Sequence, residues 1–96
     1  MSPIKRKKLN KLRNQLDKLD NHFIRLIKKR TNLVKKVLLL KEYKNQIVDN
    51  KRINIILKNI KKKSLTNKID PKITNRIWKN MIWTYIDFER RNFKKK

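Results

Sequence analysis

The residue of this sequence whose type and position most strongly suggest chemistry is an arginine on an apolar helical stripe. Between residues 9 and 40, apolar residues recur at steps of three and four, and Arg30 occupies one of these positions. The stripe consists of Leu9, Leu12, Leu16, Leu19, Phe23, Leu26, Arg30, Leu33, Val37 and Leu40. A guanidinium stays protonated, so it is costly on a packed stripe unless an anion or another hydrogen-bonding partner meets it there. A single polar residue on a stripe can also serve only to fix register or oligomeric state. Arg30 is therefore a candidate anion ligand with a purely structural alternative.

Two further cations could share an anion site with Arg30. Lys41 follows Arg30 by eleven residues, which is three helical turns to within about 20°, so both are expected on one side of a single helix. Arg13 precedes Lys41 by roughly 42 Å on such a helix and cannot reach the same site within one chain. If two copies pair antiparallel about residue 24, the partner's Arg13 falls opposite position 35, between Arg30 and Lys41. This spacing predicts two equivalent sites, each completed by the other chain.

The rest of the chain offers residues that fit the same anion site. Arg52 follows the expected helix N-cap Asp49 by three residues, so its side chain leaves the first turn beside exposed backbone N–H groups that favour anions. Tyr85 and Glu89 form an i, i+4 pair that adds a hydroxyl and a carboxyl on one helix face. Taken singly, each side chain is more simply a solvated group, and Asp49 a cap alone. Their joint placement favours a site for a small dianion.

Three helices are predicted to position these residues in one all-α domain over residues 1–96. The periodicity predicts a first helix over about 4–44, roughly 60 Å long, and a second over 49–63. A third is predicted over 70–93, because Asp70-Pro71 combines an N-cap with a proline at the first helical position. A helix of this length is too long for a compact chain of 96 residues to cover. The expected architecture is an intertwined antiparallel homodimer.

The composition excludes several other kinds of chemistry. The chain has no cysteine, one histidine and two serines, so it cannot form a disulfide, a thiolate zinc site, a histidine-based metal cluster or a catalytic triad. No metal and no cofactor are expected. No apolar run approaches the roughly 18 residues of a membrane span, and the basic start leads into an amphipathic helix rather than a signal-peptide core. A soluble cytoplasmic protein is expected.

The net charge of +23 favours nucleic acid as a partner, because clustered Lys and Arg neutralise phosphates and release counterions. Lysine outnumbers arginine 22 to 8, however, and glycine and alanine are absent, a mixture typical of compositional drift at indifferent surface positions. Under such drift the arginines are the more informative cations, since lysine serves wherever only a solvated charge is needed. The alternative from a different functional class is a basic helical dimer that binds nucleic acid. It accounts for the charge but not for Arg30 on the apolar stripe.

Several short segments, in their order and spacing, resemble the all-helical chorismate mutase family. They are Leu12-Arg13, Leu16-Asp17-Lys18-Leu19-Asp20, Leu26-Ile27-Lys28-Lys29-Arg30, Lys41, Val48-Asp49-Asn50-Lys51-Arg52 and Ile69-Asp70-Pro71. The resemblance extends from about residue 12 to residue 89. It implies an intertwined dimer of three-helix chains that rearranges chorismate to prephenate in the shikimate pathway of aromatic amino-acid biosynthesis. This pericyclic reaction needs no nucleophile, metal or cofactor.

The resemblance also implies roles for individual residues. Arg30 and the partner's Arg13 would clamp substrate carboxylates, and Lys41 would face a carboxylate and the ether oxygen. Glu89 stands where the family places a second donor to the ether oxygen, often a glutamine. The site would further be lined by Arg52 and the backbone of Asp49. Catalysis would hold the dianion in its reactive conformer and stabilise the charge that develops on the ether oxygen.

Two positions depart from the family pattern. Ile53 stands where the family usually has a glutamate that binds the substrate hydroxyl, and Tyr85 where many relatives carry a small hydroxyl residue. This pair looks more like the isochorismate-pyruvate lyase branch of the same fold. The lyase is therefore the alternative enzyme.

Overall fold

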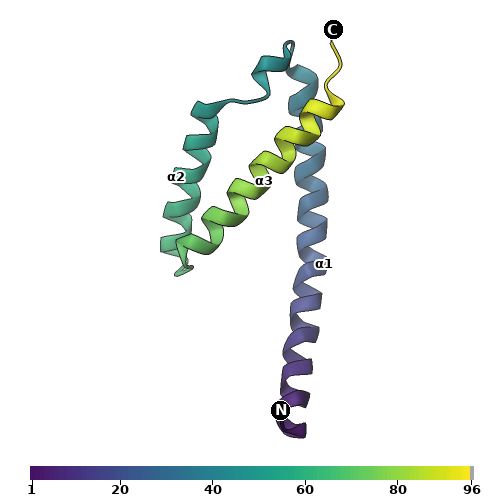
Figure 1. The fold of residues 1–96 in the computed structure, drawn as a ribbon, viewed down its shortest axis with the longest axis vertical. Helices are drawn as coiled ribbons and strands as arrows, with labels where there is room; N and C mark the ends of the chain where they lie inside the picture. The colour runs from purple at the N-terminus through teal and green to yellow at the C-terminus, as the bar shows by residue number, and fades with distance from the viewer. Residues whose placement is uncertain (96) are drawn as a thin grey trace. The chain divides into compact units, whose positions relative to one another are not determined.

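A computed structural model describes residues 1–95, and over these residues the chain is helical without strands. The elements are α1 (Pro3–Leu40), the short 3-10 helix η1 (Lys44–Gln46), α2 (Asn50–Thr66) and α3 (Pro71–Asn92), as Figure 1 shows. The predicted all-α class with three helices and a very long first one is confirmed. None of the described helices is long and apolar enough to cross a membrane.

The chain divides into two units, Met1–Leu33 and Val34–Lys96. The first unit is a single stretch of α1 that carries the larger part of the apolar stripe. Its stripe residues from Leu12 to Leu26 keep between 52% and 61% of their surface exposed. A continuous row of large apolar side chains is thus open to solvent on the isolated chain, where burial would normally be favourable.

The second unit contains a small hydrophobic core of its own. Leu38 from the end of α1, Ile47 after η1 and Ile86 on α3 are buried. Ile53 and Phe93 are among the partly buried side chains that pack against them. α2 and α3 also pack against each other in this unit. The core therefore ties the turn after α1 to the C-terminal half of α3.

The first helix ends at Leu40, so the predicted end near residue 44 was four residues too late. Lys41 N–H donates to the carbonyl of Leu38 at 3.1 Å, which closes a tight final turn. The next two backbone N–H groups, of Glu42 and Tyr43, donate to Oε1 of Gln46 at 2.7 and 2.9 Å. A side-chain acceptor thus replaces the helical carbonyls and turns the chain. Lys41 lies just beyond the helix, and the expectation that a single helix carries both Arg30 and Lys41 was wrong.

The second helix runs to Thr66, three residues beyond the predicted end at residue 63. Ser64, predicted in a loop, is buried in the last turns, and its hydroxyl donates to the carbonyl of Ile60 at 2.6 Å. The same hydroxyl lies 2.6 Å from Thr74 Oγ1 of α3, which joins the two helices. This pair of short hydrogen bonds makes Ser64 part of the packed hairpin rather than of the connection.

The connection between α2 and α3 is built without glycine. Lys68 adopts a left-handed conformation with φ of 56°. Ile69 N–H donates to the carbonyl of Ser64, and Lys68 N–H to that of Leu65, which is the hydrogen-bond pattern of a Schellman helix end. α3 then starts as predicted, with Asp70 Oδ1 accepting from Lys72 N–H and Pro71 at the first helical position.

Candidate active site

Lys41 and Glu89 lie 48 residues apart in the sequence and form a salt bridge in the structure. Lys41 Nζ is 3.1 Å from Oε2 and 3.3 Å from Oε1 of Glu89. Glu89 is buried near the C-terminal end of α3, at 6% exposure, and the Lys41 side chain is 19% exposed. A carboxylate buried to this degree needs a charged partner, and the ammonium supplies it. Two of the residues expected at the site are thus brought together.

The geometry of the pair leaves Lys41 able to bind a second anion. An ammonium has three N–H donors, and the two oxygens of Glu89 use at most two of them in this arrangement. The buried carboxylate also fixes where Nζ lies, because moving it would leave Glu89 without its partner. A cation held in place in this way can stabilise developing negative charge without first reorganising.

A cavity of about 460 Å³ adjoins Lys41 at the turn that leads into α2. The residues that line it are Lys41, Asn45, Gln46, Val48, Asp49 and Asn50. Asp49 Oδ1 accepts from Arg52 N–H at 3.0 Å, so this side chain caps α2 as predicted. The volume is in the range of small-molecule sites, and the lining combines the Lys41 cation, the capping carboxylate of Asp49 and three uncharged amide side chains.

Gln46 is the residue of this region that the sequence prediction missed. Its Oε1 holds the N–H groups of both Glu42 and Tyr43, the two residues that follow Lys41. Gln46 therefore fixes the turn from which the Lys41 side chain projects. The sequence contains a signal for this turn, because a glutamine three residues after the first residue of a turn has the spacing of a capping box.

The remaining predicted site residues are distributed over both units. Arg52 is exposed in the first turn of α2, next to Ile53, which is half-buried and packs against the core. Tyr85 is half-buried one turn before Glu89 on α3. Two of the predicted residues, Arg13 and Arg30, belong to the unit Met1–Leu33, where both are exposed. The structure thus groups Lys41 with Glu89 and, around one cavity, with Asp49.

The described residues offer no site for a catalytic metal of the usual kind. Over residues 1–95, no group of three or more His, Cys, Asp or Glu side chains is placed so that it could hold a metal ion. The chemistry that the described side chains support is electrostatic, through the ammonium of Lys41 and hydrogen bonds of its neighbours.

Comparison with known proteins gives one match. The model of the family described as chorismate mutase type II matches residues 12–90. No curated protein and no solved structure matches the chain. The match supports neither the isochorismate-pyruvate lyase alternative nor the nucleic-acid-binding alternative to the enzyme. Because this match covers residues 12–90 of a chain of 96 residues, the protein belongs to the chorismate mutase type II family of isomerases.

Proposed function

We propose that the rearrangement of chorismate to prephenate takes place at the cavity beside Lys41, with a second copy of the chain completing the site. The observation that carries this proposal is the salt bridge between Lys41 and the buried Glu89, next to a cavity of about 460 Å³. A buried ion pair would be a costly way only to pack helices, since apolar residues of similar volume serve as well. An ammonium that a carboxylate holds beside a cavity can, in contrast, bind an anion in that cavity.

The proposed mechanism needs only binding and electrostatics. Chorismate is a dianion, and in the rearrangement one C–O bond of its ether breaks while a C–C bond forms. Lys41 Nζ donates to the ether oxygen and to a neighbouring carboxylate, so it stabilises the charge that develops as the C–O bond lengthens. Holding the flexible side chain of the substrate over its ring removes much of the entropic barrier.

Further roles are part of the proposal and rest on the resemblance of this sequence to the family. Arg30 and the partner's Arg13 bind the substrate carboxylates, and Arg52 adds a third guanidinium near the start of α2. Glu89 holds Lys41 in place at the site through the salt bridge. The site is lined by the Asp49 backbone, Ile53 and Tyr85.

The exposed stripe on α1 supports the homodimer. In the unit Met1–Leu33, the large apolar residues of the stripe from Leu12 to Leu33 lie more than half exposed, and Arg30 is exposed among them. An antiparallel copy of the same helix would bury this row and bring its own Arg13 opposite position 35. Each of the two sites would then contain one arginine from the other chain.

The family match places the reaction in aromatic amino-acid biosynthesis. We propose a cytoplasmic location, which suits an enzyme whose substrate and product are both charged metabolites. Fractionation of cells that produce the protein, with antibody detection, tests this location.

The direct test is to incubate the purified protein with chorismate and, separately, with isochorismate, and to identify the products by chromatography. Prephenate from chorismate is expected. Salicylate with pyruvate from isochorismate would move the activity to the lyase branch, and turnover of neither substrate would contradict an enzyme.

A matched pair of variants locates the reaction. Lys41→Met is expected to lower turnover by about 10²-fold or more, the usual effect of losing a transition-state donor. Lys44→Met removes the same charge three residues later, from an exposed side chain in η1. This control is expected to keep most of the activity, and equal losses in both variants would contradict the proposed role of Lys41.

A further inference from the structure

The region from α2 to the middle of α3 carries an extreme excess of positive charge that the active site does not use. Residues 50–86 include ten Lys and Arg but a single acidic residue, Asp70. The carboxylate of Asp70 is engaged in capping α3. Over residues 1–95, the salt bridges are Lys41–Glu89 and Arg91–Asp87, and neither involves one of these ten cations. The charge of this region is therefore open to an external partner.

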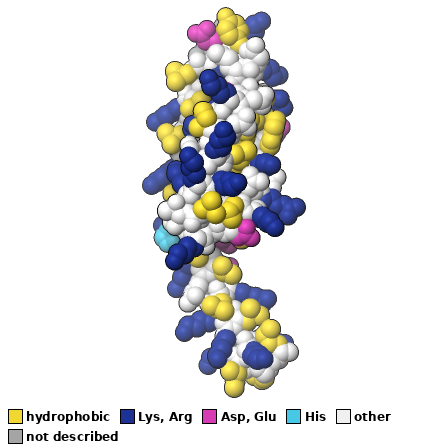
Figure 2. Space-filling model, turned by 90° about the vertical axis from the view of Figure 1, so that its left-hand side faces the viewer, with side chains coloured by type: hydrophobic (Ala, Val, Ile, Leu, Met, Phe, Trp, Pro, Cys, Tyr) yellow, Lys and Arg dark blue, Asp and Glu magenta, His cyan; other side chains and the backbone are white. Residues whose placement is uncertain are grey.

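The cations of α2 and α3 are arranged in rows. On α2, Lys51, Lys58 and Lys62 are spaced at i, i+7 and i+11, which places them along one face. On α3, the spacing of Lys72, Arg76 and Lys79 at i, i+4 and i+7 gives a second row. Figure 2 shows the side of the molecule on which α2 lies, with Lys and Arg side chains spread over it.

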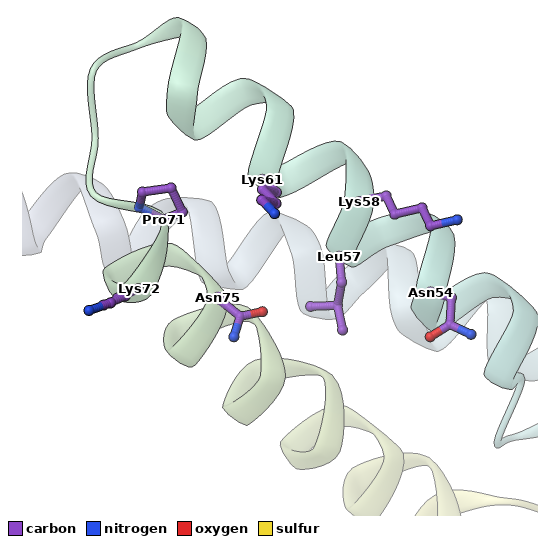
Figure 3. Close-up of a pocket in the computed structure, with 7 residues that line it drawn as sticks. All are labelled: Asn54, Leu57, Lys58, Lys61, Pro71, Lys72 and Asn75. Atoms are coloured by element: carbon purple, nitrogen blue, oxygen red, sulfur yellow. The ribbon is translucent and has the colours of Figure 1, made fainter.

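A groove lies between the two helices and is lined by one member of each row, Lys58 and Lys72. Its cavity of about 470 Å³ is lined by Lys58 and Lys61 from α2 and by Lys72 from α3, together with two asparagines, Asn54 and Asn75. Figure 3 shows the asparagine amides and Leu57 pointing into the space between the helices, while Lys58 and Lys72 extend outward. All three lysines are exposed. The groove thus has an interior that combines the apolar Leu57 with two uncharged amides, and a cationic margin.

We propose that this α2–α3 groove binds the phosphate backbone of double-stranded nucleic acid, independently of its sequence. Lysines on both margins can each neutralise a phosphate and release its counterion, and the asparagine amides can donate to phosphate oxygens between them. The lining contains no aromatic side chain on which an unpaired base could stack, which favours a duplex over a single strand. The interaction is a second activity of the chain, separate from the turnover of chorismate.

The test must distinguish this groove from the general charge of the protein. Binding of a fluorescent 20-base-pair duplex, as DNA and as RNA, is measured by anisotropy at several salt concentrations. The groove variant carries Lys58→Gln, Lys61→Gln and Lys72→Gln. The matched control carries Lys5→Gln, Lys7→Gln and Lys8→Gln, which removes the same charge from the exposed start of α1.

The groove variant is expected to bind at least one of the two duplexes about tenfold more weakly near 0.1 M salt. The slope of log K against log salt should fall by about 2 to 3, since each lost phosphate contact contributes about 0.9. The control should bind nearly as the parent does. Equal weakening in both variants, or no binding by the parent at this salt concentration, would overturn the proposal.

Chorismate turnover of the groove variant, measured in parallel, is expected to equal that of the parent. This readout separates the two activities, because the proposed active site contains none of the three substituted lysines. If turnover fell together with duplex binding while the circular dichroism spectrum stayed the same, a separate nucleic-acid groove would be contradicted.

Discussion

Two regions of the chain carry the residues of the proposed active site. They differ in how many of the contacts that hold these residues are made within a single chain. Around the end of α1, Lys41 already has its partner Glu89, a small core behind it and a turn fixed by Gln46. In the unit Met1–Leu33, Arg30 is exposed on a row of large apolar side chains that are themselves more than half exposed. The first region is preorganised, and the second has a surface that a partner would bury.

This difference separates two kinds of contribution to catalysis. Lys41, the cation proposed to face the breaking bond, is held by contacts within its own chain. The arginines proposed to bind the substrate carboxylates come from the surface that is proposed to pair with a second copy. Substrate binding would then require the dimer, whereas the geometry of Lys41 would survive in the monomer.

The largest expected effect comes from the α1 stripe. Arg30→Leu should lower kcat/KM for chorismate by about 10³-fold, since a carboxylate ligand and its charge are both lost. The same change should raise the stability of the dimer, because an apolar residue then completes the stripe. Turnover and analytical ultracentrifugation together measure both effects. A more stable dimer with unchanged activity would show that Arg30 serves only to fix the register of the paired helices.

Mixing inactive variants sharpens this test, because the proposed sites are shared. Arg30→Leu chains are unfolded and refolded together with Arg13→Lys chains, which form the second inactive homodimer. Half of the resulting dimers are mixed, and each has one intact site, so about a quarter of the parent activity should return. Refolding each variant alone is the control. Without any recovery in the mixture, the site would not be shared between chains.

The next effect concerns the chemistry of the preorganised region. A carboxylate only accepts hydrogen bonds, so Glu89 in its salt bridge with Lys41 gives the ether oxygen no donor. Glu89→Gln provides an amide donor and still offers an oxygen to Lys41 Nζ. The variant should turn over chorismate about tenfold faster than the parent, because the ether oxygen gains a second donor.

Parallel measurements of kcat in the parent and in Glu89→Gln decide this point. Thermal unfolding of both proteins shows whether the variant stays folded. Equal or lower turnover in a folded Glu89→Gln variant would contradict a donor at position 89 and leave Glu89 only the role of holding Lys41.

A smaller effect is expected from the turn that positions Lys41. Gln46→Leu removes the acceptor of two exposed N–H groups, which water can replace, so the free energy of unfolding should fall by only about 1 kcal/mol. Because Lys41 is then less well placed, kcat should fall by about tenfold, with a smaller change in KM. Gln46→Glu keeps the oxygen acceptor, so kcat should largely recover, whereas KM should rise because the added carboxylate lines the cavity proposed to bind a dianion. Equal losses in the two variants would contradict a positioning role for Gln46.

The parts of the fold that could be predicted from the sequence are those that depend on residues close together along the chain. The N-caps Asp49 and Asp70, with Pro71 after the second, fix where α2 and α3 begin, and both starts agree with the structure. The stripe on α1 was readable because its period holds over ten positions. The salt bridge between Lys41 and Glu89, 48 residues apart, was not predicted: the sequence analysis placed both residues at one site but did not pair them.

The helix ends were predicted less well, because they depend on hydrogen bonds that side chains make. Nothing in the hydrophobic period marks Leu40 as the last residue of α1, since the stop comes from the amide of Gln46. α2 continues past Lys63 because Ser64 bonds to its own helix and to Thr74 of α3, a tertiary contact. In the turn that follows α2, Lys68 takes the left-handed conformation that a glycine usually adopts at a helix end, since the chain has no glycine.

The smallest expected effect concerns the turn that follows α2. It serves as the reference for a substitution outside the proposed active site. Lys68 has φ of 56°, a conformation that costs a residue with a Cβ about 1–2 kcal/mol and glycine much less. Glycine also loses more backbone freedom on folding, so Lys68→Gly should raise the free energy of unfolding by only about 0.5–1 kcal/mol. Urea unfolding measures the gain, with Lys68→Ala as the control that removes the charge and keeps the Cβ. Chorismate turnover should not change, since the Schellman end of α2 contributes no residue to the proposed site. A loss of stability in Lys68→Gly would show that the lysine side chain, and not its backbone conformation, is what this turn requires.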